Sequence, residues 1–209
     1  MALSSALSSL PPGSPRALLE RPDGAEAQTQ GVPAEAAAVS LQQMLDRREA
    51  RVAAQQALLA RHGRPLAQLT VVSPGPVKDT PDARFVFQQG RQALEALLAG
   101  TGLRVLARQQ ALLATGPEAL WAVDGDALEL KRQLVALEDG HPLGRLWDLD
   151  VLDRDGMGVS RQGLGLPVRT CLLCGQPAHA CARSAAHALA DLQRAIGDRV
   201  DAHRQRTAA

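Results

Sequence analysis

The stretch LAQLTVVSPGPVKDTPD, residues 66–82, is expected to join a strand to a helix and so to begin the central part of the fold. Its first part, residues 66–72, is a short apolar run typical of a buried strand. Residues 73–76 hold two prolines and a glycine, which indicate a rigid loop. Residues 80–82 supply an N-cap oxygen, a proline for the first turn and an acid near the positive end of the helix dipole. Apolar residues then recur at helical spacing, and we expect this helix to end at Gly100.

Three more strands and one more helix follow this unit. The apolar patterns predict strands at 103–113, 119–123 and 144–152, with a helix at about 128–137 before the last of them. Gly116-Pro117 is expected to form a turn. The order strand, helix, strand, strand, helix, strand is that of a split βαββαβ (ferredoxin-like) α+β sandwich, which is the fold class that we predict.

Further elements are expected on both sides of this sandwich. Upstream, the spacing of apolar residues predicts a helix that begins after Ser40 and ends at Gly63. Downstream, we expect a glycine-rich hairpin or loop at 156–167, a cysteine segment at 171–181 and a helix from about 184 to 200.

The chain length and local composition set the domain organisation. The 209 residues suffice for one sizeable domain with a tail. Residues 1–38 are rich in Ala, Ser, Pro and Gly, and such a segment buries too little apolar surface to offset its ordering entropy. We therefore predict a flexible low-complexity extension at 1–38 and a single domain at 39–204, which includes a C-terminal part at 168–200.

The overall composition disfavours several classes of protein. There are 23 Lys+Arg against 22 Asp+Glu, a net charge of +1, so no excess of positive charge is available to coat a nucleic acid. Aromatic residues make up 2%, too few for base-stacking platforms. No run of about 18 apolar residues predicts a membrane span. The 3 cysteines do not suit a secreted disulfide framework, so we expect a cytoplasmic protein.

Two acids in the last predicted strand are the first candidate site. Asp148 and Asp150 alternate with apolar residues, so both carboxylates should lie on the same face of the strand. Such a pair can bind Mg²⁺, and the guanidinium of Arg145 can hold a phosphate. The alternative is a solvated strand face. A phosphatase of the haloacid dehalogenase type is rejected, because too little chain follows Asp150 to complete that fold.

The loop after the first strand is the second candidate. Lys78 is one of only two lysines, and it lies beside Gly75 in a loop that leads into a helix N-terminus. A lysine and helix-terminal amides suit an anionic phosphate. The alternative is a structural turn with an exposed lysine.

A cluster of cysteines is the third candidate. Cys171, Cys174, Cys181 and His187 can supply four ligands for a tetrahedral zinc, with His179 as a competing fourth ligand. Four protein ligands would make such a site structural rather than catalytic. A redox-active pair or plain buried thiols are the alternatives.

Together these motifs resemble a known family. The strings VVSPGPVKD at 71–79, HPLGRLWDLDV at 141–151, RTCLLC at 169–174 and CAR at 181–183 closely resemble the CitX family. Its members are apo-citrate lyase phosphoribosyl-dephospho-CoA transferases, also called citrate lyase holo-acyl-carrier-protein synthases. The resemblance spans roughly residues 40–190, and it implies no role for the N-terminal extension before about residue 39.

The resemblance implies a nucleotidyltransferase-type reaction in a catalytic domain at 39–204. A serine of the acyl carrier protein (the gamma subunit of apo-citrate lyase) attacks 2′-(5″-triphosphoribosyl)-3′-dephospho-CoA, and diphosphate leaves. Asp148 and Asp150 would then hold Mg²⁺, Arg145 and Lys78 would bind phosphates, and one carboxylate would help to deprotonate the serine.

Other roles stay open. A third carboxylate could come from Asp79, Glu138 or Asp153, and His141 could approach the site. The exposed arginines expected to meet an acidic carrier are Arg161, Arg169 and Arg183. The competing functions are a non-catalytic, zinc-stabilised adaptor that binds an acyl-carrier protein, and a nucleotidyltransferase acting on another nucleoside triphosphate.

Overall fold

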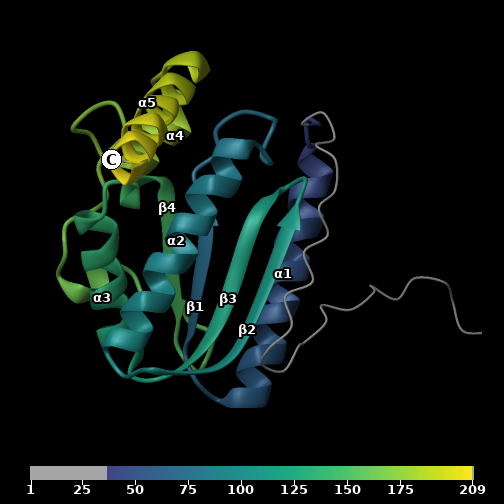
Figure 1. Cartoon of the computed structure of the whole chain (residues 1–209). Coiled ribbons are helices and arrows are strands. Elements are labelled where there is room, and N and C mark those ends of the chain that lie inside the picture. Colours follow the sequence, from purple (N-terminus) through teal and green to yellow (C-terminus); the bar gives the residue numbers. More distant parts are fainter. Residues whose placement is uncertain (1–36, 209) are drawn as a thin grey trace, which may run out of the picture.

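A four-stranded antiparallel sheet forms the centre of the computed structural model, which describes residues 37–208 (Figure 1). Its strands are β1 (Leu66–Val71), β2 (Arg104–Leu113), β3 (Gly116–Asp124) and β4 (Trp147–Leu152), in the order β2-β3-β1-β4. All three neighbouring pairs are antiparallel. The prediction for the extension concerns residues 1–38, nearly all of which lie outside the described residues.

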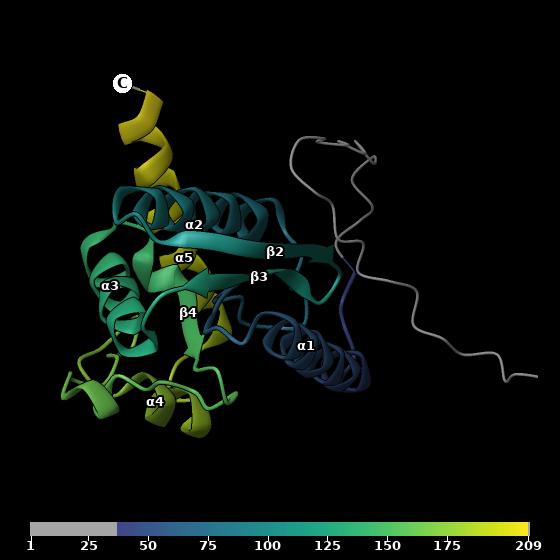
Figure 2. The same cartoon turned by 90° about the horizontal axis from the view of Figure 1, so that it is seen from below.

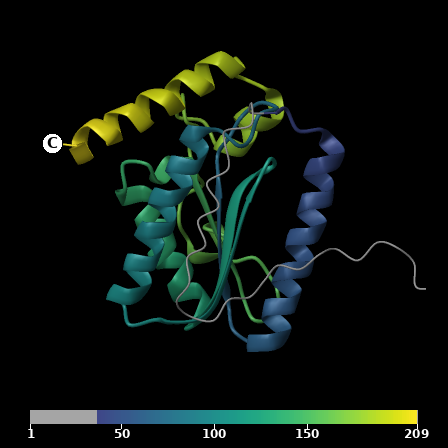
Figure 3. The same cartoon turned by 45° about the vertical axis from the view of Figure 1, so that its right-hand side comes forward.

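Helices cover both faces of the sheet. Figure 2 shows α2 (Pro81–Gly100) and α3 (Ala127–Gly140) on one side and α1 (Leu41–His62) on the other. The chain ends with α4 (Ala178–Ser184) and α5 (Leu189–Ala208), and α5 lies across one end of the sheet (Figure 3). Within residues 37–208, no helix is long and apolar enough to cross a bilayer. The protein thus combines α-helices with an antiparallel β-sheet, which confirms the prediction of a mixed α and β structure.

The two faces of β1 contact different helices, which explains why the successive residues 66–69 are all buried. Ala67 and Leu69 pack with residues of α2 and α3, while Leu66 packs against Leu58 of α1. All three strand residues are fully buried. A strand covered on both sides loses the alternation of polar and apolar residues that marks a half-exposed one.

The predicted helix starts are confirmed by their caps. Ser40 forms a capping box with Gln43 at the start of α1, and the hydroxyl of Thr80 accepts from the Ala83 N–H at the start of α2. Gly63 ends α1 with a left-handed φ of 59°, a conformation that glycine adopts without steric cost.

Three predicted boundaries are wrong. Gly116-Pro117 is not the turn but the start of β3; the proline is tolerated because the pairing of β3 with β1 begins only at Ala119. Residues 144–146 form a 3₁₀ turn rather than strand, so β4 starts at Trp147. The C-terminal helix starts at Leu189 rather than at about 184, since Ala185 adopts a left-handed conformation that ends the short helix α4 before it.

His203 fastens α5 to the body of the protein. Its ring is buried and lies 5.3 Å from the ring of His141 and 6.1 Å from that of Phe85, measured between centroids. Its Nε2 pairs with the side-chain oxygen of Gln89 at 3.2 Å, whereas its Nδ1 is buried without a partner among the described residues. Burial, together with the positive charge of Arg206, lowers the pKa of His203.

We expect acid to destabilise the protein through these two histidines. Burial and the neighbouring charges hold the pKa of both His141 and His203 below 6.5 in the folded state, and Nδ1 of His141 must stay unprotonated to accept from the Leu143 N–H. In the unfolded chain both histidines bind protons at a higher pH than they do in the folded protein. The free energy of unfolding therefore decreases as pH falls through about 6.5. Urea unfolding at about pH 7.5 and about pH 5.5 measures this change.

The matched variant is His203→Phe, which keeps a ring and removes the titrating nitrogen. Its free energy of unfolding should decline less over the same pH interval than that of the unmodified protein. An unchanged pH dependence in this variant would show that the buried His203 does not cause the acid sensitivity.

Candidate functional site

Asp148 and Asp150 lie on the same face of β4, as predicted. Their side chains are 55% and 53% exposed, while Trp147, Leu149 and Val151 between and beside them are buried against the core. The β1 partners of the two acids are Thr70 and Gln68 respectively. This alternation leaves two carboxylates available to solvent from a rigidly held strand.

Two buried charged residues of α3 hold the outer edge of β4. Glu138 accepts a hydrogen bond of 2.8 Å from the Leu149 N–H, and the ammonium of Lys131 donates to the Leu149 carbonyl at 2.6 Å. The two side chains are 4% and 7% exposed. Because β4 is the last strand in the order β2-β3-β1-β4 of the described residues, these side chains replace strand pairing at its outer edge.

The charge of Asp148 affects the neighbouring acid Asp150. Burial and the nearby carboxylate of Asp148 raise the pKa of Asp150 above 3.8, although the Lys131 ammonium, 3.9 Å from its Oδ1, opposes the shift. A pair of carboxylates that repel each other is a favourable place for a cation.

Arginines from two segments gather beside this strand. Arg169 donates to the carbonyl oxygens of Gly144 and Trp147, and its guanidinium lies 3.4 Å from Asp148 and 3.2 Å from Glu138. Arg145 donates to the carbonyl of Thr170. The segment before the cysteines is thereby fixed against the start of β4, and Arg169 was not predicted to contact Asp148.

The second candidate, the loop after β1, lies at the same end of the sheet. Lys78 turns back on this loop and donates to the Ser73 carbonyl at 2.6 Å, and burial lowers the pKa of Lys78. Gly75 has a φ of 89°, and a Cβ there would lie 3.1 Å from Leu189 at the start of α5. The structure therefore shows the lysine engaged within its loop and the glycine required by its conformation.

The three acids considered as a third carboxylate are all engaged elsewhere. Asp79 accepts two hydrogen bonds from Arg84, and Glu138 supports the edge of β4. Asp153 accepts from the backbone N–H groups of Asp155 and Met157 in a turn. His141, also considered, lies with its ring 4.4 Å from that of Trp147 and serves the packing of this corner.

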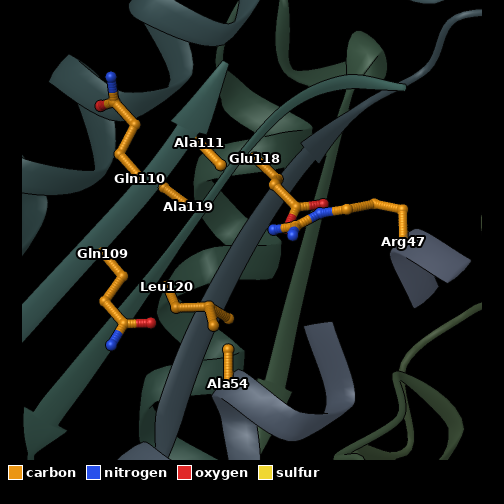
Figure 4. Close-up of a pocket in the computed structure, with 8 residues that line it drawn as sticks. All are labelled: Arg47, Ala54, Gln109, Gln110, Ala111, Glu118, Ala119 and Leu120. Atoms are coloured by element: carbon orange, nitrogen blue, oxygen red, sulfur yellow. The ribbon is translucent and has the colours of Figure 1, made fainter. Parts of the chain in front are cut away.

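Sequence reasoning missed a buried acid on the face of the sheet that α1 covers. Glu118 of β3 is 8% exposed and pairs with Arg47 of α1 (Figure 4). It also pairs with Arg51 of the same helix. These partners are 71 and 67 residues away in sequence, and no local motif marks them. Because both arginines already neutralise it, Glu118 fastens α1 to the sheet rather than offering a free ligand.

The cysteine cluster assembles as predicted. One ligand atom each from Cys171, Cys174, Cys181 and His187 lies within 4.8 Å of all the others, so this group can hold a metal ion such as zinc. His187 lies between α4 and α5 rather than on the terminal helix, and His179 is exposed outside the group.

The arginines expected to be exposed differ from one another. Arg161 is only 14% exposed and pairs with Glu138 and Asp139, and Arg169 is 19% exposed, so neither presents a free charge. Arg183 is exposed, as predicted.

Comparisons with known proteins agree on one family. Residues 39–203 match the family model described as CitX, apo-citrate lyase phosphoribosyl-dephospho-CoA transferase. A protein of that name from Citrobacter koseri is 48% identical over 157 residues, which cover 74% of this chain and 85% of the relative. Another from Escherichia coli O7:K1 is 45% identical over 155 residues, with the same coverage of both chains.

Proposed function

Since the chain belongs to the family of apo-citrate lyase phosphoribosyl-dephospho-CoA transferases, we propose that its transfer reaction takes place at Asp148 and Asp150. The chain is an enzyme that transfers the phosphoribosyl-dephospho-CoA prosthetic group to apo-citrate lyase. The single observation that carries the proposed site is the pair of exposed carboxylates on one face of β4, within the long string that first pointed to the family.

The proposed reaction joins a carrier serine to the donor. The serine oxygen bonds to the phosphorus nearest the ribose of the triphosphoribosyl-dephospho-CoA, the bond to the next bridging oxygen breaks, and diphosphate leaves. The serine proton passes to a base, and we assign this step to one carboxylate of the aspartate pair.

The residues of β4 suit a divalent cation. Asp148 and Asp150 would hold Mg²⁺ through oxygen ligands, and both side chains are exposed enough to share it with phosphate oxygens. When bound, the ion would offset the charge of the triphosphate. Lys78 would leave the Ser73 carbonyl to bind a phosphate, Gly75 would let the loop approach it, and Arg145 would add a second cation.

The fold that presents these residues is proposed to be a split βαββαβ unit of the ferredoxin-like kind over 66–152. The antiparallel order β2-β3-β1-β4 supports this classification. So does the packing of α2 and α3 against the same face of the sheet.

The function is tested by mass spectrometry of the carrier. The protein, apo-citrate lyase acyl carrier protein and the triphosphoribosyl donor are incubated with Mg²⁺, and the carrier is weighed. It should gain the mass of the phosphoribosyl-dephospho-CoA group. A carrier of unchanged mass would refute the function, and a gain of AMP in a parallel reaction with ATP would reveal a different donor.

The cysteine cluster is proposed to hold one structural zinc. Cys171, Cys174, Cys181 and His187 offer three thiolates and an imidazole, and Cys174 lies 3.6 Å from Cys181 and 3.4 Å from His187 between ligand atoms. The site has no protein position left open for a substrate, so its role would be to hold residues 169–187 in place.

We expect elemental analysis to find about one zinc per chain, and Cys174→Ser to lose most of it. The unmodified thiols hold the ion by charge as well as geometry, which the serine hydroxyl cannot replace. Limited proteolysis should then cut the 169–187 segment faster. His179→Ala is the control and should keep the zinc, because His179 lies outside the group. Purified protein without metal but with full activity would contradict this role.

A further inference from the structure

The two polar residues of β1, Thr70 and Gln68, lie opposite the two acids of β4. Thr70 pairs with Asp148 and Gln68 with Asp150 in the antiparallel register. Residues directly opposite each other in such a pair point to the same face of the sheet, with their Cβ atoms about 4.5–5.5 Å apart. The other four residues of β1 are apolar. The polar positions of this strand therefore coincide with the acids at which we place the transfer.

The hydroxyl of Thr70 is not used by the fold. The side chain is half-buried, and its hydroxyl forms no hydrogen bond with any residue in the described range 37–208. A valine has the same branched shape and would pack against the neighbouring strands equally well, so the packing of the sheet does not require a hydroxyl at this position. The hydroxyl is thus free to bond a ligand that lies over the acids.

The amide of Gln68 is held in place but only half used. Gln68 is 6% exposed, and its Oε1 accepts a hydrogen bond of 2.6 Å from Nε2 of Gln55 in α1. The N–H groups of its own Nε2 bond no residue in the part of the chain that the structure describes. Polar groups inside folded proteins are nearly always bonded, so these N–H groups call for an acceptor.

The opposite side of the acids is already occupied by cations. The guanidinium of Arg169 lies 3.4 Å from Asp148 and the ammonium of Lys131 lies 3.9 Å from Asp150, and both cations also bond backbone carbonyls of β4. The side toward β1 offers a neutral hydroxyl and a neutral amide instead. Phosphate oxygens accept hydrogen bonds and cannot donate them to these groups, so a phosphate chain is complementary to the O–H and N–H groups of β1.

We propose that Thr70 and Gln68 bind the triphosphate of the triphosphoribosyl substrate by hydrogen bonds and so fix it beside Asp148 and Asp150. The proposal rests on the transfer function and adds two substrate-binding residues to its site. Both side chains keep their protons throughout the transfer, because they bond oxygens of the phosphates and do not take part in the exchange at phosphorus. Gln55 contributes indirectly, by fixing the orientation of the Gln68 amide.

The test is a calorimetric titration of the triphosphoribosyl substrate with Mg²⁺ and without the carrier. Thr70→Val removes the hydroxyl and keeps the shape of the side chain. Its dissociation constant should rise by about 10-fold to 100-fold, the loss expected for one hydrogen bond to a charged group. Thr70→Ser keeps a hydroxyl and should retain most of the affinity. In the complete reaction, the KM of Thr70→Val for this substrate should rise as well, because the contact exists before the transfer.

The controls separate substrate binding from folding and from the function itself. Gln68→Met removes both polar atoms at similar length and should also weaken binding, with urea unfolding as the check that it folds. Thr207→Val makes the same change as Thr70→Val near the end of α5, where the hydroxyl bonds carbonyls of its own helix, and should bind normally. Equal binding by Thr70→Val and the unmodified protein would overturn the proposal while transfer by the unmodified protein still supported the function. An unmodified protein that neither bound this substrate nor transferred its group would refute both.

Discussion

Asp148→Asn and Asp150→Asn should each lower the rate of transfer by roughly 100-fold to 1000-fold, the usual cost of removing one group that stabilises transition-state charge. Asparagine keeps the size of the side chain and its hydrogen-bonding capacity but loses the negative charge that a cation needs. Both side chains are more than half exposed, so the free energy of unfolding should change by less than about 1 kcal/mol. Single-turnover transfer to the carrier, followed by mass, measures the rate.

An exposed acid outside the pair provides a matched control. Asp155→Asn changes an exposed acid in the turn after β4, whose carboxylate lies 3.8 Å from Arg154, and transfer should stay near normal. If both β4 variants transferred the group at near-normal rates, the aspartate pair would not be the reaction site. Rates that recovered at higher Mg²⁺ concentration would support a weakened ion site.

Gly144→Ala is expected to have the largest effect on the fold. A Cβ at Gly144 would lie 2.7 Å from the carbonyl carbon of Glu138 and 2.8 Å from its Cα, which is closer than real Cβ atoms come to backbone. The end of α3 would have to move away from the 3₁₀ turn before β4, and such overpacking costs about 3 kcal/mol. Because Glu138 also holds the Leu149 N–H, the displacement should reach Asp148 and reduce transfer.

Gly140→Ala is the control for this substitution. Gly140 is at the end of the same helix, and a Cβ there would meet no atom within 4 Å. Thermal unfolding should show a large drop in midpoint for Gly144→Ala and little change for Gly140→Ala. Equal midpoints would mean that the close approach of Gly144 to α3 does not constrain the fold.

Local patterns predicted the parts of the structure that depend on a few neighbouring residues. Alternation along 147–151 placed Asp148 and Asp150 on one face, since successive strand residues point to opposite sides. The capping residues Ser40 and Thr80 marked helix starts, because their side chains bond the backbone three residues on. The spacing of the cysteines indicated the group that the fold brings together.

The sequence could not predict contacts made across long separations. Glu118 looks like any strand acid until α1 supplies Arg47 and Arg51, and Glu138 was considered as a ligand because nothing local shows that it faces the edge of β4. The sequence predicts that the C-terminal helix ends at about residue 200, whereas α5 is longer. The helix continues to Ala208 because a histidine, His203, takes the next buried position.

Hydrogen bonds from the protein itself occupy the outer edge of β4, and this affects how another protein can bind there. Along this edge, Arg169 bonds the Trp147 carbonyl, the side chains of α3 bond both groups of Leu149, and the Val159 N–H bonds the Val151 carbonyl at 2.8 Å. These bonds leave little of the edge free to template a foreign strand. An incoming protein is therefore hindered from extending the sheet at β4, which removes a route to aggregation. If the transfer takes place at Asp148 and Asp150 as proposed, the carrier would present its serine over the face of the sheet instead.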